Sequence, residues 1–102
     1  GTPHAADAQT PPPRGAIAGR VTDPTGAPVA RAAVRIRALA RTVATDSAGA
    51  FRIDTVVPGR LTVTVTAVRF APAEVPVAVV AGEVAQVVVR LRPAAPVTLG
   101  NV

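Results

Sequence analysis

The sequence predicts an all-β fold, and three observations lead to that class. Valine, threonine and alanine are abundant along the chain, and the first two are β-branched residues that favour strands. The 8 glycines and 11 prolines are spread between short apolar runs, where turns are expected. Several of these runs alternate apolar and polar residues with the period of two that a half-buried strand requires.

The composition is that of one folded domain. The 102 residues are 49% hydrophobic and 17% charged, which is typical of a globular chain of single-domain length. The sequence has no cysteine, so disulfides and thiolate chemistry are excluded. No run reaches the roughly 20 apolar residues that a membrane-spanning helix needs, and we expect that the chain itself does not span a membrane.

The stretch formed by residues 45–53 joins a tight turn to a strand. Asp46 heads the turn, where its side chain can bond the backbone two residues on, and Gly49 closes the turn with a positive φ. In the following strand Phe51 and Ile53 point to the same face. Because Phe51 is one of only two aromatic residues in the chain, we expect it to anchor the core.

Seven short strands are predicted in all, separated by turn residues. They span residues 16–22, 33–38, 41–45, 51–56, 61–66, 74–80 and 84–92. Asp23–Gly26 has the residue types of a type I turn. Pro76 cannot donate to a strand ladder, so residues 74–80 should form an edge strand. Seven strands at this spacing predict a β-sandwich.

The two ends of the chain lie outside the strand pattern. The sequence therefore divides into an N-terminal arm at residues 1–14, a domain at residues 15–93 and a C-terminal tail at residues 94–102. Pro11, Pro12 and Pro13 predict a short polyproline II rod in the arm. Such an arm is expected to lie extended on a neighbouring protein.

Ala6-Asp7-Ala8 has the small-x-small form that signal peptidase accepts. No hydrophobic segment precedes it in this sequence. Either the match is accidental or the signal has already been removed. We expect an exported protein, located in the periplasm or outside the cell.

Two segments that each contain an Asp-x-x-Gly turn resemble carboxypeptidase regulatory-like domains. They read Ile17-x-Gly19-x-Val21-x-Asp23-x-x-Gly26-x-Pro28-Val29 and Thr45-Asp46-x-x-Gly49-x-Phe51-x-Ile53, and the second is followed by Pro58-Gly59-x-Leu61. The last strand, ending in Leu91-Arg92-Pro93, is similar as well.

The resemblance covers residues 15–93 and implies a seven-stranded, Greek-key-type β-sandwich, transthyretin-like or Ig-like. It also implies structural roles for a set of turn and core residues, namely Gly19, Asp23, Gly26, Asp46, Gly49, Phe51, Pro58 and Gly59. Two positions depart from the family pattern. Leu61 replaces a usual aromatic residue, and Arg69 stands before Phe70 where glycine is common.

The chain offers no set of catalytic residues. Its single histidine, His4, lies in the arm, so Ser47 has no base beside it and a nucleophilic triad cannot be assembled. Asp23 and Asp46 each head a turn, and hydrogen bonding to the backbone accounts for both. The ligand patterns of calcium and zinc sites are absent. Transthyretin-like sandwiches include a hydrolase lineage, but its site needs several histidines. We expect no enzyme activity and no cofactor.

Charge is the main functional signal. The net charge is +5 and every basic residue is arginine. Arg35 and Arg37 are predicted to share the outer face of one strand, and Arg90 and Arg92 that of another. These pairs are either solvated residues that keep sheet edges apart or contacts for an acidic partner such as a protein, anionic lipid or charged polysaccharide. Two aromatic residues cannot form a stacking platform, which disfavours nucleic acid.

Three functions are compatible with these residues. The first is an exported structural subunit that docks on a larger, membrane-embedded assembly through its arm and arginine faces. The second, implied by the resemblance, is an N-terminal domain of a TonB-dependent outer-membrane receptor or a domain of a surface protein. The third is a carbohydrate-binding module that uses the row Thr62, Thr64 and Thr66. Sugar-binding sandwiches usually expose aromatic rings, and both phenylalanines are expected in the core.

Overall fold

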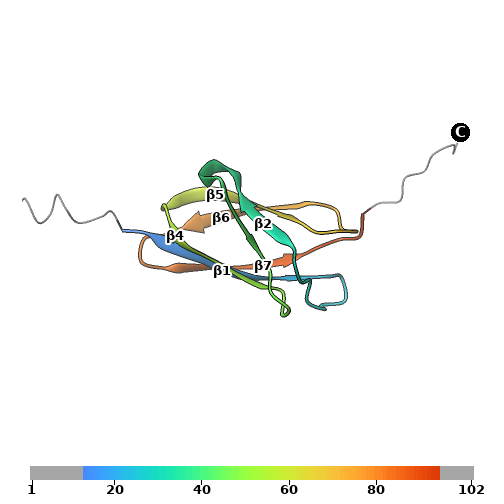
Figure 1. Ribbon diagram of the computed structural model, residues 1–102. Helices are drawn as coiled ribbons and strands as arrows, with labels where there is room; N and C mark the ends of the chain where they lie inside the picture. Colours follow the sequence, from blue (N-terminus) through green and yellow to red (C-terminus); the bar gives the residue numbers. More distant parts are fainter. Residues whose placement is uncertain (1–12, 95–102) are drawn as a thin grey trace, which may run out of the picture.

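The computed structural model describes residues 13–94, and within them seven β-strands and one short 3-10 helix form a two-layer sandwich (Figure 1). The elements are β1 (Gly15–Thr22), β2 (Ala33–Ile36), η1 (Arg37–Leu39), β3 (Arg41–Ala44), β4 (Ala50–Val56), β5 (Gly59–Thr66), β6 (Ala73–Val79) and β7 (Val84–Arg90). The all-β prediction is confirmed. None of the helical segments in this part of the chain has the length and apolarity needed to cross a membrane.

The two sheets have different topologies. In the three-stranded sheet β1 is central, with β4 antiparallel on one side and β7 parallel on the other. The four-stranded sheet has the order β3-β2-β5-β6, and its neighbours are antiparallel. As predicted, β6 is an edge strand, and Pro76 lies opposite Thr62 of β5. A missing N–H donor is tolerated at such an edge.

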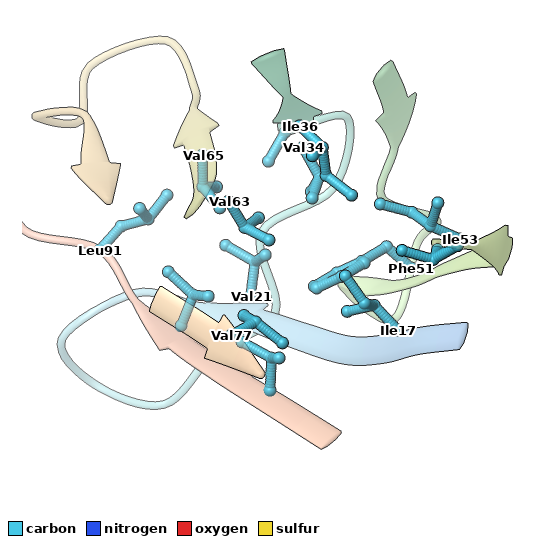
Figure 2. Close-up of a cluster of buried hydrophobic side chains, with 14 of the residues drawn as sticks. Ile17, Val21, Val34, Ile36, Phe51, Ile53, Val63, Val65, Val77 and Leu91 are labelled. Atoms are coloured by element: carbon cyan, nitrogen blue, oxygen red, sulfur yellow. The ribbon is translucent and has the colours of Figure 1, made fainter. Parts of the chain in front are cut away.

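The core is made of aliphatic side chains that the two sheets direct toward each other (Figure 2). The alternation is clearest in β5, where Val63 and Val65 are fully buried while Thr62, Thr64 and Thr66, which alternate with them, point outward. Phe51 is 5% exposed and lies among these aliphatic groups, as its position in the sequence predicted. Because aliphatic burial contributes about 25 cal/mol per Å², these inward-facing residues supply most of the stability.

Phe51 depends on a glycine in the neighbouring strand. Gly19 of β1 pairs with Phe51 of β4 in the sheet register. A Cβ at Gly19 would lie 2.6 Å from Cζ of the Phe51 ring and 2.2 Å from the carbonyl oxygen of Val87. Since neither contact is possible for a real side chain, the bare backbone at position 19 gives the aromatic ring its place.

The predicted strand at residues 33–38 is wrong at its C-terminal end. The chain leaves the sheet after Ile36 and forms the 3-10 turn η1, which ends at Ala40 with a left-handed φ of 51°. The Ala40 N–H donates to the Arg37 carbonyl at 3.1 Å. This turn brings Leu39 against the core as a half-buried residue. A strand that continued through residue 38 would not bring Leu39 to the core in the same way. Arg35 and Arg37 therefore belong to different elements.

The predicted strand at residues 84–92 is also shorter, because β7 ends at Arg90. Its alternation nevertheless continues: Leu91 is fully buried, and its N–H donates to the Thr22 carbonyl at 2.8 Å. Phe70 and Pro93 then form an isolated bridge. The segment after β7 is thus held to the sandwich without extending the regular ladder.

The two departures from the family pattern have different local outcomes. Leu61 is half-buried against the core, so an aliphatic residue occupies the place of the usual aromatic ring. Arg69 has a φ of 74°, which is the left-handed conformation that glycine adopts without penalty. The backbone at this turn keeps the shape that glycine favours, and the Phe70 N–H donates to the Ala67 carbonyl at 3.1 Å.

We expect Phe51→Ala to unfold much of the protein at 37 °C. Removing a buried phenylalanine ring typically costs about 3–5 kcal/mol, which is a large share of the stability of a small domain. Thermal melting followed by circular dichroism measures the effect. Phe70→Ala is the matched control, because Phe70 is only half-buried and should cost less. A melting temperature of Phe51→Ala within a few degrees of the parent would contradict the role of this ring.

Candidate functional site

The two Asp-x-x-Gly turns share one hydrogen-bonding pattern. In each turn the aspartate Oδ1 accepts from the backbone N–H groups two and four residues further on, at 2.9 Å in every case. Gly26 donates its N–H to the Asp23 carbonyl at 3.0 Å, and Gly49 donates to Asp46 at 2.9 Å. Both glycines have positive φ, 90° and 73°. The two carboxylates are therefore acceptors that shape the backbone.

Asp23 has one additional partner. The Thr25 hydroxyl donates to Asp23 Oδ1 at 2.7 Å. This hydrogen bond, together with those from the backbone N–H groups, lowers the pKa of Asp23 below its ordinary value, because each of them stabilises the ionised carboxylate. A carboxylate held in its charged form by local donors is poorly suited to act as a general acid.

The described residues bring together no metal-binding cluster. Between residues 13 and 94, no three side chains of His, Cys, Asp or Glu lie close enough to hold a metal ion. Ser47 is exposed in the Asp46 turn, and His4 lies outside the described residues.

Thr45 is a buried polar residue that sequence reasoning did not single out as a contact. Its hydroxyl donates to the Val29 carbonyl at 2.6 Å and accepts from the Ala32 N–H at 2.9 Å. In the part of the chain that the structure describes, every buried polar side-chain atom has a partner. The sequence indicates these hydrogen bonds only weakly, because threonine is common at the end of a strand whether or not its hydroxyl is buried.

The outer face of the four-stranded sheet gathers arginine and threonine side chains. We call this surface the Arg–Thr face, and its residues are Arg35, Arg37, Thr42, Arg60, Thr62, Thr64 and Thr66. Arg35 lies between two hydroxyl-bearing residues, because the register places it opposite Thr42 of β3 and opposite Thr64 of β5. Two shallow depressions of about 330 and 420 Å³ lie on this face, and both are bordered by Arg37 and Thr64.

The Arg–Thr face carries an excess of positive charge. Among the residues that the structure describes, its one acidic neighbour is Glu74 of β6, which is opposite Thr64 in the register. Within residues 13–94 the single ion pair joins Arg52 to Asp54 at 2.7 Å, on the other sheet. Arg35, Arg37 and Arg60 therefore have no carboxylate at salt-bridge distance among the described residues, and their guanidinium groups are available to an anionic partner.

The second predicted arginine pair lies elsewhere. Arg90 belongs to the outer face of the three-stranded sheet, where it pairs with Thr22 in the register. One of its guanidinium nitrogens donates to the Pro24 carbonyl in the Asp23 turn. Arg92 follows the end of β7 and is exposed. The structure thus does not join the two predicted pairs into one surface, and it commits Arg90 partly to a turn.

The remaining predicted residues are divided between the domain and its arm. Pro58 precedes Gly59, which begins β5 with a φ of 139°. Pro13 is exposed, while Pro11 and Pro12 lie outside the described residues. Their proposed contact with a partner stays a prediction.

The residues that sequence reasoning missed at this face are Thr42 and Arg60. The arginine pair at 35 and 37 and the threonine row at 62–66 were recognised as two separate signals. They form one surface because β2 pairs with β5, a long-range pairing for which the local pattern offers no direct sign. Arg60 lies outside the alternating run that begins at Leu61, so periodicity did not point to it.

Two sheets packed face to face, joined in part by turns in which Asp23 and Asp46 are hydrogen-bond acceptors, define a β-sandwich of the Ig-like type. The model of the carboxypeptidase regulatory-like domain matches residues 16–92. The chain belongs to this family of non-catalytic modules. A search of curated proteins gives no significant match.

Solved structures with the same fold share little sequence with the chain. A chain of the type II cohesin–X-dockerin complex from Acetivibrio cellulolyticus, an N-terminal interface mutant, is 21% identical with a TM-score of 0.66, and the match covers 78% of this chain and 58% of that one. The minor pilin of Streptococcus agalactiae is 15% identical with a TM-score of 0.67, and the match covers 87% and 48%. A putative carbohydrate-binding protein from Bacteroides uniformis is 24% identical with a TM-score of 0.59, and the match covers 79% and 42%. The chain therefore spans about half the length of these proteins.

Thr25→Ala should raise the pKa of Asp23 toward its ordinary value of 3.8, because it removes the hydroxyl donor. NMR titration of the carboxyl carbon measures this change. A carboxylate whose pKa is lower in the folded than in the unfolded state stabilises the fold at pH values above its unfolded-state pKa. This stabilisation is lost as the pH falls through the folded-state pKa. The free energy of unfolding of the variant should therefore depend less on pH in this acidic range. Ser47→Ala in the other turn is the control and should leave Asp23 unchanged. An unaltered Asp23 pKa in Thr25→Ala would contradict the assignment.

Proposed function

We propose that this domain is an exported, non-catalytic interaction subunit that docks on a larger, membrane-associated protein assembly. The observation that carries the proposal is the Arg–Thr face. There Arg35, Arg37 and Arg60 lie on one side of the four-stranded sheet, and among residues 13–94 Glu74 is the one acidic residue beside them. A surface of this charge favours a partner with exposed carboxylates.

The residue types on this face suit contacts with protein. A guanidinium group presents a planar fork of donors that matches a carboxylate, and it is more weakly hydrated than an ammonium group, so its burial costs less. Arg35 has hydroxyl groups on both neighbouring strands, at Thr42 and Thr64. These hydroxyls can donate to the same anion or accept from a partner. Because Arg35 and Arg60 lie on paired strands and Arg37 lies in the turn η1 that follows β2, little backbone ordering is needed on binding.

The comparisons support a binding module in general terms. One structural relative belongs to a cohesin–dockerin complex, which is an association between proteins. An N-terminal domain of a TonB-dependent receptor or a domain of a surface protein, the alternative that the resemblance implies, could present the same face to a neighbouring domain.

Carbohydrate binding is the second candidate, and the relative from Bacteroides uniformis is its specific support. The Arg–Thr face carries no aromatic residue on which a sugar ring could stack. Phe51 is buried and Phe70 is half-buried against the core. A neutral glycan therefore fits this face less well than an acidic protein surface.

Reversing two charges on the Arg–Thr face should weaken docking. In Arg35→Glu/Arg37→Glu, retention of the native assembly from a detergent-solubilised envelope fraction should fall by about tenfold or more, because two exposed arginines that attract carboxylates become groups that repel them. The salt dependence of the remaining binding should flatten. Immobilised domain and quantitative mass spectrometry of the retained proteins measure both effects.

Arg90→Glu/Arg92→Glu is the matched control, since it changes the net charge by the same amount. Its arginines lie outside the Arg–Thr face, so its loss of retention should be clearly smaller. Circular dichroism shows whether both variants are folded. Equal retention by the parent and Arg35→Glu/Arg37→Glu would contradict the proposed face, and selective loss in the control would assign docking to the other pair.

The arm should add to this binding. Deletion of residues 1–13 is expected to reduce retention of the same assembly, because a proline-rich segment has restricted conformations and loses less entropy when it is ordered on a partner. Residues 1–12 lie outside the described residues, so this expectation rests on the sequence. Retention is compared with that of the full chain after melting curves establish that both are folded. Undiminished retention would show that the arm is passive and would favour the receptor-domain alternative.

A further inference from the structure

The outer face of the three-stranded sheet breaks the usual pattern of solvent-facing strands. An outward position on a half-exposed sheet is normally polar, yet β7 directs Val84 and Val88 outward. Their exposed fractions are 40% and 77%. In the register Val88 lies beside Arg20 of the central strand, and Arg20 lies beside Ala50 of β4. Departures from polar patterning of this kind mark candidate functional surfaces.

The same face is hollowed along its central strand. Ala18 of β1 lies between two longer side chains in the register, Arg52 of β4 and Gln86 of β7. A depression of about 440 Å³ lies over this part of the sheet and is bordered also by Arg20 and Val88. The short side chain of Ala18 thus leaves a shallow groove between these longer side chains. We call it the β1 trough.

Charge around the β1 trough defines the kind of partner that it fits. Arg20 is exposed and has no carboxylate at salt-bridge distance within residues 13–94. Arg90 lies further along the same face, while Arg52 is neutralised by Asp54. A partner therefore needs carboxylates for the arginines and apolar side chains for the alanine and valine surface.

A second copy of this chain fits the trough poorly. A two-fold contact places the same patch of each copy against the other, so the excess of arginine on this face, at Arg20 and Arg90, would be doubled at the interface. Like charges opposed across an interface are unfavourable. The exposed valines would gain burial, but among residues 13–94 the carboxylates at this face are Asp54, which already pairs with Arg52, and Glu83 in the turn before β7.

We propose that the β1 trough is a second docking surface, which binds an acidic amphipathic segment of another polypeptide. Apolar side chains of that segment cover Ala18 and Val88, and its carboxylates pair with Arg20. Because the trough and the Arg–Thr face lie on opposite sheets of the sandwich (Figure 1), the domain holds two partners at the same time. This function as a connector goes beyond docking through a single face.

The test uses two synthetic peptides of twelve residues as probes, one that alternates leucine with glutamate and one in which every leucine is replaced by serine. Each is titrated into the isotope-labelled domain, and amide chemical shifts are followed by NMR. The leucine peptide should shift the amides of Ala18, Arg20 and Val88. The serine peptide, which carries the same charge, should bind this face at least about fivefold more weakly.

Point variants assign the binding to the trough. Val88→Gln and Arg20→Gln should each raise the Kd of the leucine peptide about fivefold, and both positions are exposed, so the fold should survive. Arg35→Gln/Arg37→Gln, on the opposite sheet, should leave this Kd unchanged. The two proposals can therefore fail separately. Variants of the Arg–Thr face test docking on the assembly without changing the β1 trough, and variants of the trough test peptide binding without changing the Arg–Thr face.

Three results would overturn the proposal. The first is the absence of shifts at Ala18 and Val88 at millimolar peptide. The second is equal binding of the leucine and serine peptides, which would reduce the trough to a charged surface. The third is concentration-dependent dimerisation that Val88→Gln abolishes, which would make a second copy the occupant.

Discussion

The hydroxyl of Thr45 is the contact on which the arrangement of the two sheets depends. It donates to the Val29 carbonyl and accepts from the Ala32 N–H, so it fixes the connection between β1 and β2 against the end of β3. Both backbone groups would lose a partner without it, and an unpaired buried group costs about 1–3 kcal/mol. One buried side chain thus links two connections between the sheets. The β1–β2 connection leads from the three-stranded to the four-stranded sheet, and the β3–β4 connection leads back.

The residues after Thr45 extend the same constraint. The Val21 N–H donates to the Gly49 carbonyl at 2.8 Å, and a Cβ at Gly49 would lie 2.5 Å from the Val21 carbonyl oxygen. The Asp46 turn therefore packs directly on the end of β1. From this fixed point β4 runs along β1 in the register that places Phe51 opposite Gly19. The close approach of the Asp46 turn to the end of β1 therefore determines both the hydrogen bond from Val21 to the turn and the register that places Phe51 in the core.

Local features of the fold were predictable because they depend on short stretches of sequence. The alternation of valine and threonine at residues 61–66 defines β5, and Pro76 correctly predicted an edge strand. The end of β2 was not predictable in this way, because residues 37–39 leave the sheet to bring Leu39 to the core. The Arg–Thr face was recognised only in part, since its two halves meet through the pairing of β2 with β5. Local periodicity specifies which residues face outward, but the order of the strands determines which outward residues are neighbours.

The parallel pairing of β1 with β7 has a mechanical consequence. The register runs from Ala16 beside Val84 to Thr22 beside Arg90, so the chain enters β1 at one end of the sandwich and leaves β7 at the other. A force that pulls these two ends apart acts parallel to β1 and β7. It is thus perpendicular to the direction in which the hydrogen bonds between the two strands point. It therefore loads the interstrand hydrogen bonds together instead of breaking them one after another. A domain built in this way can carry tension between two attached bodies with little extension.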